Sequence, residues 1–293
     1  MLKLYCVTGY KVHEGDPIIN GRQSREMIFE EVQDISLSDV ARLQTAVCRC
    51  DNLVGEVYRI NSVVDAAKEF RETLSSLNSD NVEAILTADR RFRSYVLEFD
   101  MFLDYWESSI AHYKRIDGIA DDHIVANYKQ LFKDLTHAAY DNHVEYQLLD
   151  LIRNQTAHVQ SPVNRIHCSI DGNEAFAFRD VLLSKCKNGP NKKRILQAQD
   201  AEIALSPLVD VTEKCLQEIQ TNLIDFQLDE LVKEESKYIG GFIGYAISKN
   251  HLYEPWVLMD DEIVPPRPQH IKDIKAYGYL LERLETKKNL NTN

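Results

Sequence analysis

The chain lacks the cysteine spacing of a small metal or redox site. Its six cysteines, at positions 6, 48, 50, 168, 186 and 215, include no C-x-x-C pair, which excludes a zinc ribbon and a thioredoxin-type motif. We interpret them as reduced, mostly buried thiols. Four of the nine histidines fall between 137 and 167, but they lack the H-E-x-x-H or one-helix i, i+4 spacing of a metal site. The sequence therefore predicts no metal.

Long apolar runs and excess positive charge are also missing. No run of 18 apolar residues occurs, and polar residues soon follow the opening Met1-Leu2-Lys3-Leu4-Tyr5. We therefore expect neither a membrane-spanning helix nor a signal-peptide core, and we expect a cytoplasmic location. Lys and Arg number 34 against 46 Asp and Glu, a net charge of −12. Broad binding of a phosphate backbone depends on Lys and Arg, so any RNA contact has to be local.

Glycine is scarce, at 11 residues in 293. Its one dense group, Gly240-Gly241-Phe242-Ile243-Gly244, matches neither a dinucleotide fingerprint nor a Walker loop, because both need glycines at set offsets with a Lys-Ser/Thr or a later acid. We interpret residues 238–248 as a strand with close backbone packing. No nucleotide cofactor is expected.

Helical periodicity dominates the middle of the chain. Apolar residues recur at helical spacing in segments near 38–50, 61–77, 80–114, 122–140 and 207–235, and short connections between successive helices favour an antiparallel bundle. The longest segment carries one apolar face, made of Ile85, Phe92, Val96, Phe99, Leu103, Trp106 and Ile110. We interpret that face as core.

A small β part is expected beside the bundle. Residues 2–35 are typical of extended chain with turns, and Arg165 to Ile170 and Glu174 to Phe178 flank Asp171-Gly172-Asn173, a hairpin signal. The predicted fold is mainly α, a helical bundle with a small β addition. Three ranges are expected: a β segment at 1–35, the bundle at 36–235 with a hairpin inserted at 163–179, and a strand and helix at 236–293.

One helix ends in a compact polar motif. Asn142 followed by Glu145 predicts a helix start, and Pro162 predicts its end. The buried stripe of this helix is expected to consist of Val144, Leu148, Leu151 and Ile152.

The motif is Arg153-Asn154-Gln155-Thr156-Ala157-His158. An arginine can hold a phosphate through its planar fork of donors, and a histidine moves protons near neutral pH. On an ideal helix Asn154 and His158 share a face, and Arg153 lies roughly 100° and 140° from them. Either the helix unwinds near Ala157 or a second copy of the motif completes the site.

Arg153, Asn154 and His158 resemble the signature of the HEPN superfamily, in which a polar residue follows an arginine and a histidine lies four to six residues beyond that arginine. The resemblance covers at most residues 36–235, and its specific part runs from Asn142 to Pro162. It implies an all-α bundle, a homodimer with facing motifs, and a metal-independent endoribonuclease that needs no cofactor. An antitoxin or regulatory partner and a role as a toxin or phage-defence effector are implied only by analogy with the family.

In that reading RNA is the substrate, and its 2′-hydroxyl attacks the adjacent phosphorus. His158 acts as general acid or base, Arg153 stabilises the phosphorane charge, and Asn154 orients the phosphate or the histidine. Glu145 and Asp150 are candidate partners of these residues. The most basic stretch of the chain follows the hairpin and is expected to form a substrate-binding loop, made of Lys185, Lys187, Lys192, Lys193 and Arg194.

Two alternatives stay open. One is an unrelated helical enzyme that uses the histidines with a metal, which the metal content of the purified protein would reveal. The other is a noncatalytic helical interaction or RNA-binding protein that retains the HEPN fold, which the acidic composition favours. In that case Arg153 is a surface residue paired with Asp150 or Glu145, and His158 is favoured by the helix dipole. The basic stretch is then an ordinary solvated loop.

Overall fold

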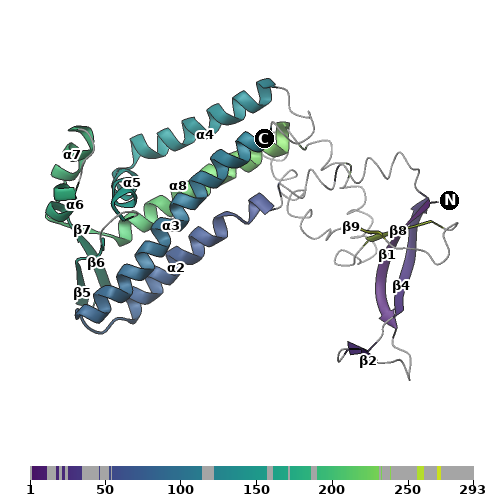
Figure 1. Ribbon diagram of the computed structural model, residues 1–293, viewed down its shortest axis with the longest axis horizontal. Helices are drawn as coiled ribbons and strands as arrows, with labels where there is room; N and C mark the ends of the chain where they lie inside the picture. Colours follow the sequence, from purple (N-terminus) through teal and green to yellow (C-terminus); the bar gives the residue numbers. More distant parts are fainter. Residues whose placement is uncertain are drawn as a thin grey trace. The chain divides into compact units, whose positions relative to one another are not determined.

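The computed structural model describes residues 2–11, 18–19, 22–23, 26–34, 46, 53, 55–113, 122–156, 161–170, 172–185, 190–230, 232, 238, 256–260 and 269–271. The chain divides into two compact units. One consists of residues 57–225, and the other combines residues 1–56 with residues 226–293 (Figure 1). None of the described helices is both long and apolar enough to cross a membrane.

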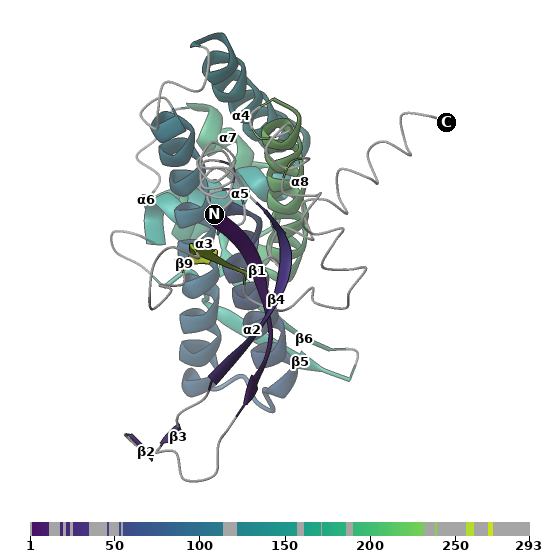
Figure 2. The same ribbon diagram turned by 90° about the vertical axis from the view of Figure 1, so that its right-hand side faces the viewer.

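The unit of residues 57–225 is mainly helical with a small antiparallel sheet, which confirms the prediction of a mainly α fold with a small β addition. Its long helices are α2 (Ile60–Ser76), α3 (Val82–Tyr113), α4 (Asp122–Asn142), α5 (Val144–Thr156) and α8 (Ser206–Glu230), the last of which continues into the other unit. Two short helices, α6 (Arg179–Lys185) and α7 (Pro190–Gln197), lie between α5 and α8 in the chain. Helices α2, α3 and α8 run side by side (Figures 1 and 2).

The core of this unit is built on the aromatic face of α3. Phe92, Phe99 and Trp106 are fully buried there. The ring of Phe92 packs on Phe70 of α2 at a centroid distance of 5.4 Å, and the ring of Phe99 meets Tyr146 of α5 at 5.2 Å. The face that periodicity predicts is therefore the one that joins α3 to its neighbours.

The stripe predicted for α5 is confirmed with one exception. Leu148, Leu151 and Ile152 are buried, but the side chain of Val144 is 41% exposed. Val144 is the first residue of α5, and the buried stripe of this helix begins one turn later, at Leu148.

A three-stranded antiparallel sheet follows α5, in the order β5 (Arg165–Ser169), β6 (Gly172–Phe178) and β7 (Glu202–Ala204). The predicted hairpin is present, but its turn comes earlier than Asp171-Gly172-Asn173, because Ser169 pairs with Gly172. Gly172 has φ +134°, which favours glycine. Asn173 already belongs to β6, and its Nδ2 donates to the carbonyls of Leu74 and Leu77, both at 2.7 Å. The hairpin is thereby held to the end of α2.

In the other unit, strands from residues 2–34 and from residues 256–271 share one sheet. The antiparallel order is β4 (Glu26–Asp34), β1 (Leu2–Lys11), β8 (Trp256–Asp260) and β9 (Gln269–Ile271). Strands β2 (Ile18–Ile19) and β3 (Arg22–Gln23) pair on either side of the Asn20-Gly21 dipeptide. The extended character expected for residues 2–35 is thus found, whereas the pairing of β1 with β8 is not predicted by any local pattern.

Three predicted elements fall largely outside the described residues. They are the helix near 38–50, the strand at 238–248 and the terminal helix from Ile271, which itself lies in β9.

Candidate functional site

The helix that carries the motif begins directly after another helix. Helix α4 ends at Asn142 and α5 begins at Val144, so His143 is the whole connection. The side-chain amide of Gln147 donates to the carbonyl oxygen of Tyr140 at 2.6 Å, which satisfies one of the orphan carbonyls at the end of α4. The predicted start at Asn142 is therefore close to the observed one.

Arg153 lies in the last turn of α5 and is held by two carboxylates. Its Nη1 is 3.1 Å from Oδ1 of Asp100 on α3, and its Nη2 is 3.0 Å from Oδ1 of Asp150 on α5. The side chain of Arg153 remains 25% exposed. The fork of the guanidinium is thus fixed in direction but still reaches the surface.

Asp150 connects Arg153 to a second cation. The other carboxylate oxygen of Asp150 is 3.1 Å from Nζ of Lys192 on α7. Its main-chain carbonyl accepts a hydrogen bond of 2.7 Å from Nδ2 of Asn154. Asp150 therefore touches three of the residues predicted from sequence to bind RNA or to take part in its cleavage: Arg153 and Lys192 through its carboxylate, and Asn154 through its main-chain carbonyl.

Arg153 and Asn154 do not converge, as the helical angles predict. Arg153 reaches outward to α3, and the amide of Asn154 donates back to its own helix. His158 lies outside the described residues, since the structure describes residues up to 156 and again from 161. The described site therefore consists of Arg153, Asn154 and their neighbours, without the imidazole of His158.

The predicted basic loop contains a helix. Lys192, Lys193 and Arg194 lie on α7, with Lys193 and Arg194 exposed and Leu196 buried beneath them. Lys185 ends α6, and Lys187 lies outside the described residues. Describing 192–194 as loop is therefore wrong. A helix that packs through Leu196 presents its cations in a fixed direction.

Of the two candidate acidic partners, Asp150 rather than Glu145 contacts Arg153. Glu145 lies toward α8, where its charge helps to raise the pKa of Cys215. Burial is the main cause that raises the pKa of Tyr146 above its ordinary value, and the charge of Asp150 adds to it. The phenol next to the cluster therefore stays protonated throughout the neutral range.

Sequence reasoning missed two aspartates of α3 that hold the chain on both sides of the motif. Asp100 binds Arg153 within it. Asp89 is buried, and its Oδ1 accepts a hydrogen bond of 3.2 Å from the main-chain N–H of Val163 after the motif. Arg93 donates to the other oxygen of Asp89 at 2.8 Å. No local pattern singles out Asp100, because acidic residues on the polar side of a helix are ordinary. Asp89 did carry a signal, since it stands four residues after Ile85 and three before Phe92, within the apolar face predicted for this helix.

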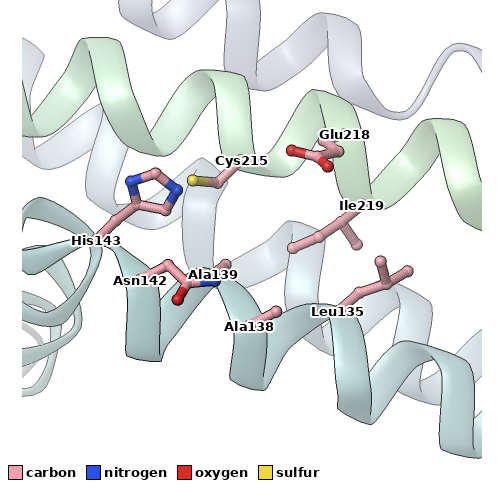
Figure 3. Close-up of a pocket in the computed structure, with 8 residues that line it drawn as sticks. All are labelled: Leu135, Ala138, Ala139, Asn142, His143, Cys215, Glu218 and Ile219. Atoms are coloured by element: carbon pink, nitrogen blue, oxygen red, sulfur yellow. The ribbon is translucent and has the colours of Figure 1, made fainter.

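A separate pocket of about 200 Å³ lies between α4 and α8 (Figure 3). Figure 3 shows the thiol of Cys215 and the ring of His143 at one end of it. Burial, aided by Glu218 and Glu145, raises the pKa of Cys215 to about 11, so the thiol is not a ready nucleophile at neutral pH. Across the described residues, no group of three or more His, Cys, Asp or Glu side chains is placed to hold a metal ion.

Comparison with known proteins gives no relative for this chain: no family model matches it, and neither a curated protein nor a solved structure is detectably similar.

Proposed function

We propose that the protein is a metal-independent endoribonuclease of the HEPN type. The observation that carries the proposal is the cluster around Asp150. Arg153, in the last turn of α5, and Lys192, on α7, lie against opposite oxygens of that one carboxylate. Two cations held this close at the surface can contact neighbouring phosphate oxygens of one RNA strand.

The reaction follows from the chemistry of these groups. The 2′-hydroxyl of RNA loses its proton and attacks the adjacent phosphorus, the bond from phosphorus to the 5′-oxygen breaks, and the products carry a 2′,3′-cyclic phosphate and a 5′-hydroxyl. His158 takes or gives the proton. Arg153 stabilises the negative charge of the phosphorane, and Asn154 orients the phosphate or the histidine.

The placement of positive charge supports local contact with RNA. Helix α7 presents Lys193 and Arg194 to solvent next to the paired Lys192, on a chain whose net charge is −12. A strand bound there is attracted over a few nucleotides and repelled elsewhere, which favours short or unpaired substrates.

Cleavage in the presence of EDTA tests the proposal. We expect the protein to cut single-stranded RNA without added metal and to leave 2′,3′-cyclic phosphate ends, which mass spectrometry of the products identifies. Arg153→Ala and His158→Ala should each abolish cutting and leave the circular dichroism spectrum unchanged. The matched control is Arg165→Ala, since Arg165 is likewise an arginine paired with a carboxylate, Glu202, at 2.8 Å.

Requirement for added magnesium or manganese would move the chemistry to a metal site and overturn the proposal. If Arg153→Ala and His158→Ala both unfold, the two residues stabilise the fold and their role in catalysis is rejected.

The second candidate function is a noncatalytic helical protein that binds RNA or another partner. It is favoured by the charge balance of the cluster, in which Arg153 and Lys192 meet Asp100 and Asp150, two cations against two anions. Such a cluster holds α3, α5 and α7 together without a net attraction for phosphate. Tolerance of high expression separates the candidates, because an active ribonuclease is toxic unless an antitoxin restrains it.

A further inference from the structure

The pocket between α4 and α8 has a buried, largely apolar floor. Ile219 and Cys215 of α8 and Ala139 of α4 are buried there. Leu135 of α4 points toward Ile219 at the end of the pocket opposite His143 and Cys215 (Figure 3). A thiol that stays protonated behaves as a small apolar group. The floor therefore suits the apolar body of a ligand, whereas a charge placed there would lack a partner.

The rim of the pocket is polar and open to solvent. Asn142, His143 and Glu218 line the pocket and are all exposed. They come from both walls, since Asn142 ends α4, His143 follows it, and Glu218 lies on α8. A carboxylate, the carbonyl oxygen of an amide and a neutral imidazole nitrogen all accept hydrogen bonds. The rim therefore offers acceptors for the three N–H donors of a primary ammonium.

The charge around the pocket is mainly negative. Burial is the main cause that raises the pKa of the Cys215 thiol, and the charges of Glu218 and Glu145 add to it. None of the ion pairs between described residues involves either glutamate. No Lys or Arg lines the pocket, and Lys214, one turn before Glu218, is exposed outside it. His143 is the one lining side chain that can become positive, when its imidazole is protonated. The field at the pocket therefore favours a cation.

The size of the pocket limits the ligand. Its volume of about 200 Å³ is below the roughly 300–1,000 Å³ of pockets that hold drug-sized molecules. A single ring or a short branched chain that carries one ammonium group matches this space.

We propose that this pocket binds a small apolar amine in its protonated form. The ring or chain of the amine lies on the floor formed by Ala139, Cys215 and Ile219, and its ammonium group lies at the rim against Glu218. None of the lining residues belongs to the cluster around Asp150, so the proposal is independent of the ribonuclease function.

Three probes of similar shape and different charge test the chemical class of the ligand: para-fluorobenzylamine, para-fluorobenzyl alcohol and para-fluorobenzoate. Fluorine NMR titrations at about pH 8, where a primary amine is protonated, measure their dissociation constants. We expect the amine to bind, the alcohol to bind at least about threefold more weakly, and the benzoate not to bind detectably. Glu218→Gln should raise the dissociation constant of the amine about two- to fivefold, the range of an exposed ion pair, and leave that of the alcohol unchanged. The matched control is Glu83→Gln, at an exposed glutamate in the first turn of α3, which should change neither.

Filling the pocket tests the location. Ala138 lines the pocket and is exposed, so Ala138→Leu places a larger side chain in it without changing the buried core. We expect this variant to bind the amine at least about tenfold more weakly, whereas Ala126→Leu, at another exposed alanine of α4, should bind like the wild type. Circular dichroism verifies that each variant is folded.

A wild-type protein that binds none of the probes, or that binds the amine and the alcohol equally, overturns the proposal. Unchanged binding of the amine to Ala138→Leu also overturns it, because the amine then lies elsewhere on the acidic surface. Binding is measured without RNA, so these outcomes leave the ribonuclease proposal untouched, and a protein that cleaves no RNA leaves the amine site untouched.

Discussion

Two arginines in the helical unit each bridge two carboxylates, and they differ in what surrounds them. Arg71 on α2 binds Asp210 and Glu213 of α8, at 2.7 Å and 2.5 Å. Arg153 binds Asp100 and Asp150, but Asp150 also binds Lys192. The first cluster has one cation for two anions, whereas the second has two cations for two anions. The second cluster is therefore neutral and repels an added anion less than the first.

The difference extends to the role of each arginine in folding. Burial acts to lower the pKa of Arg71, but its hydrogen bonds to Glu213 and Asp210 outweigh this and raise it, so Arg71 stays charged and clasps α2 to α8. Glu213 is 12% exposed and depends on that cation. Because each arginine binds two carboxylates, both could serve only to hold helices together. The second cation beside Arg153, Lys192, is what makes that cluster the candidate site, whereas Arg71 links α2 to α8.

The largest expected effect is the loss of RNA cleavage, the proposed activity, when Arg153 is replaced. Arg153→Ala should lower the cleavage rate by at least about 100-fold, the usual cost of removing one donor to a transition-state charge. Stability should fall by no more than about 1 kcal/mol, because Lys192 still pairs with Asp150 and the side chain of Asp100 is 39% exposed. Arg153→Lys should also be impaired, because lysine keeps the charge but lacks the fork. The cleavage rate is measured on a short RNA, and the free energy of unfolding is measured in urea. If Arg71→Met lost as much cleavage activity as Arg153→Ala, the two arginines would not differ in role.

Arg71→Met should give the opposite result. It leaves Glu213 without its cation and should destabilise the protein by about 1–3 kcal/mol, with the cleavage rate of the folded protein unchanged. Urea unfolding at neutral pH measures the loss. A variant as stable as the wild type would show that the ion pairs of Arg71 with Asp210 and Glu213 make no net contribution to the free energy of unfolding.

The fold was largely predictable because burial periodicity is a local property. The core face of α3, the stripe from Leu148 to Ile152 and the hairpin all follow from residues close in sequence. The contacts of Arg153 were not predictable to the same degree. Asp150, on the same helix, is within reach of a sequence argument, whereas Asp100 and Lys192 come from other helices and meet the motif only after packing.

Helix α7 was missed for a different reason. Asn188-Gly189-Pro190 is typical of a turn, but Pro190 is the first residue of the helix, a position that proline favours because its missing N–H has no partner there. A turn signal in the sequence can therefore also mark the start of a helix.

A smaller effect is expected from the exposed cations of α7. Changing Lys193 and Arg194 to Gln should reduce the magnitude of the slope of log K against log salt for RNA binding by about 1.4, from roughly 0.7 for each lost contact with a single strand. Fluorescence anisotropy at several salt concentrations measures the slope. The same change at Arg165 and Lys214, which lie on β5 and α8, serves as control. An unchanged slope in the α7 variant would show that Lys193 and Arg194 do not contact RNA.

The smallest effect concerns the thiol in the pocket. Its pKa of about 11 implies that iodoacetamide at pH 8 modifies Cys215 about 100-fold more slowly in the folded protein than in urea. The unfolded thiol ionises first, so the free energy of unfolding should fall between about pH 8.5 and about 11, and Cys215→Ala should remove that part of the fall. Peptide mass spectrometry follows the modification. Equal rates in both states would mean that the thiol is already accessible and ionised.

The pairing of Lys3 with Met259 sets an order of events during synthesis. A ribosome adds about 5–20 residues per second, so the unit of residues 57–225 is complete a few seconds before Trp256 is added. The helical unit can therefore pack before β8 exists to pair with β1. During that interval the nascent chain exposes the unpaired edge of β1, which is open to pairing with other chains. A transcript broken before codon 256 makes that exposure permanent, so truncated chains should be substrates for chaperones and proteases even though they contain helices α2 to α8 in full.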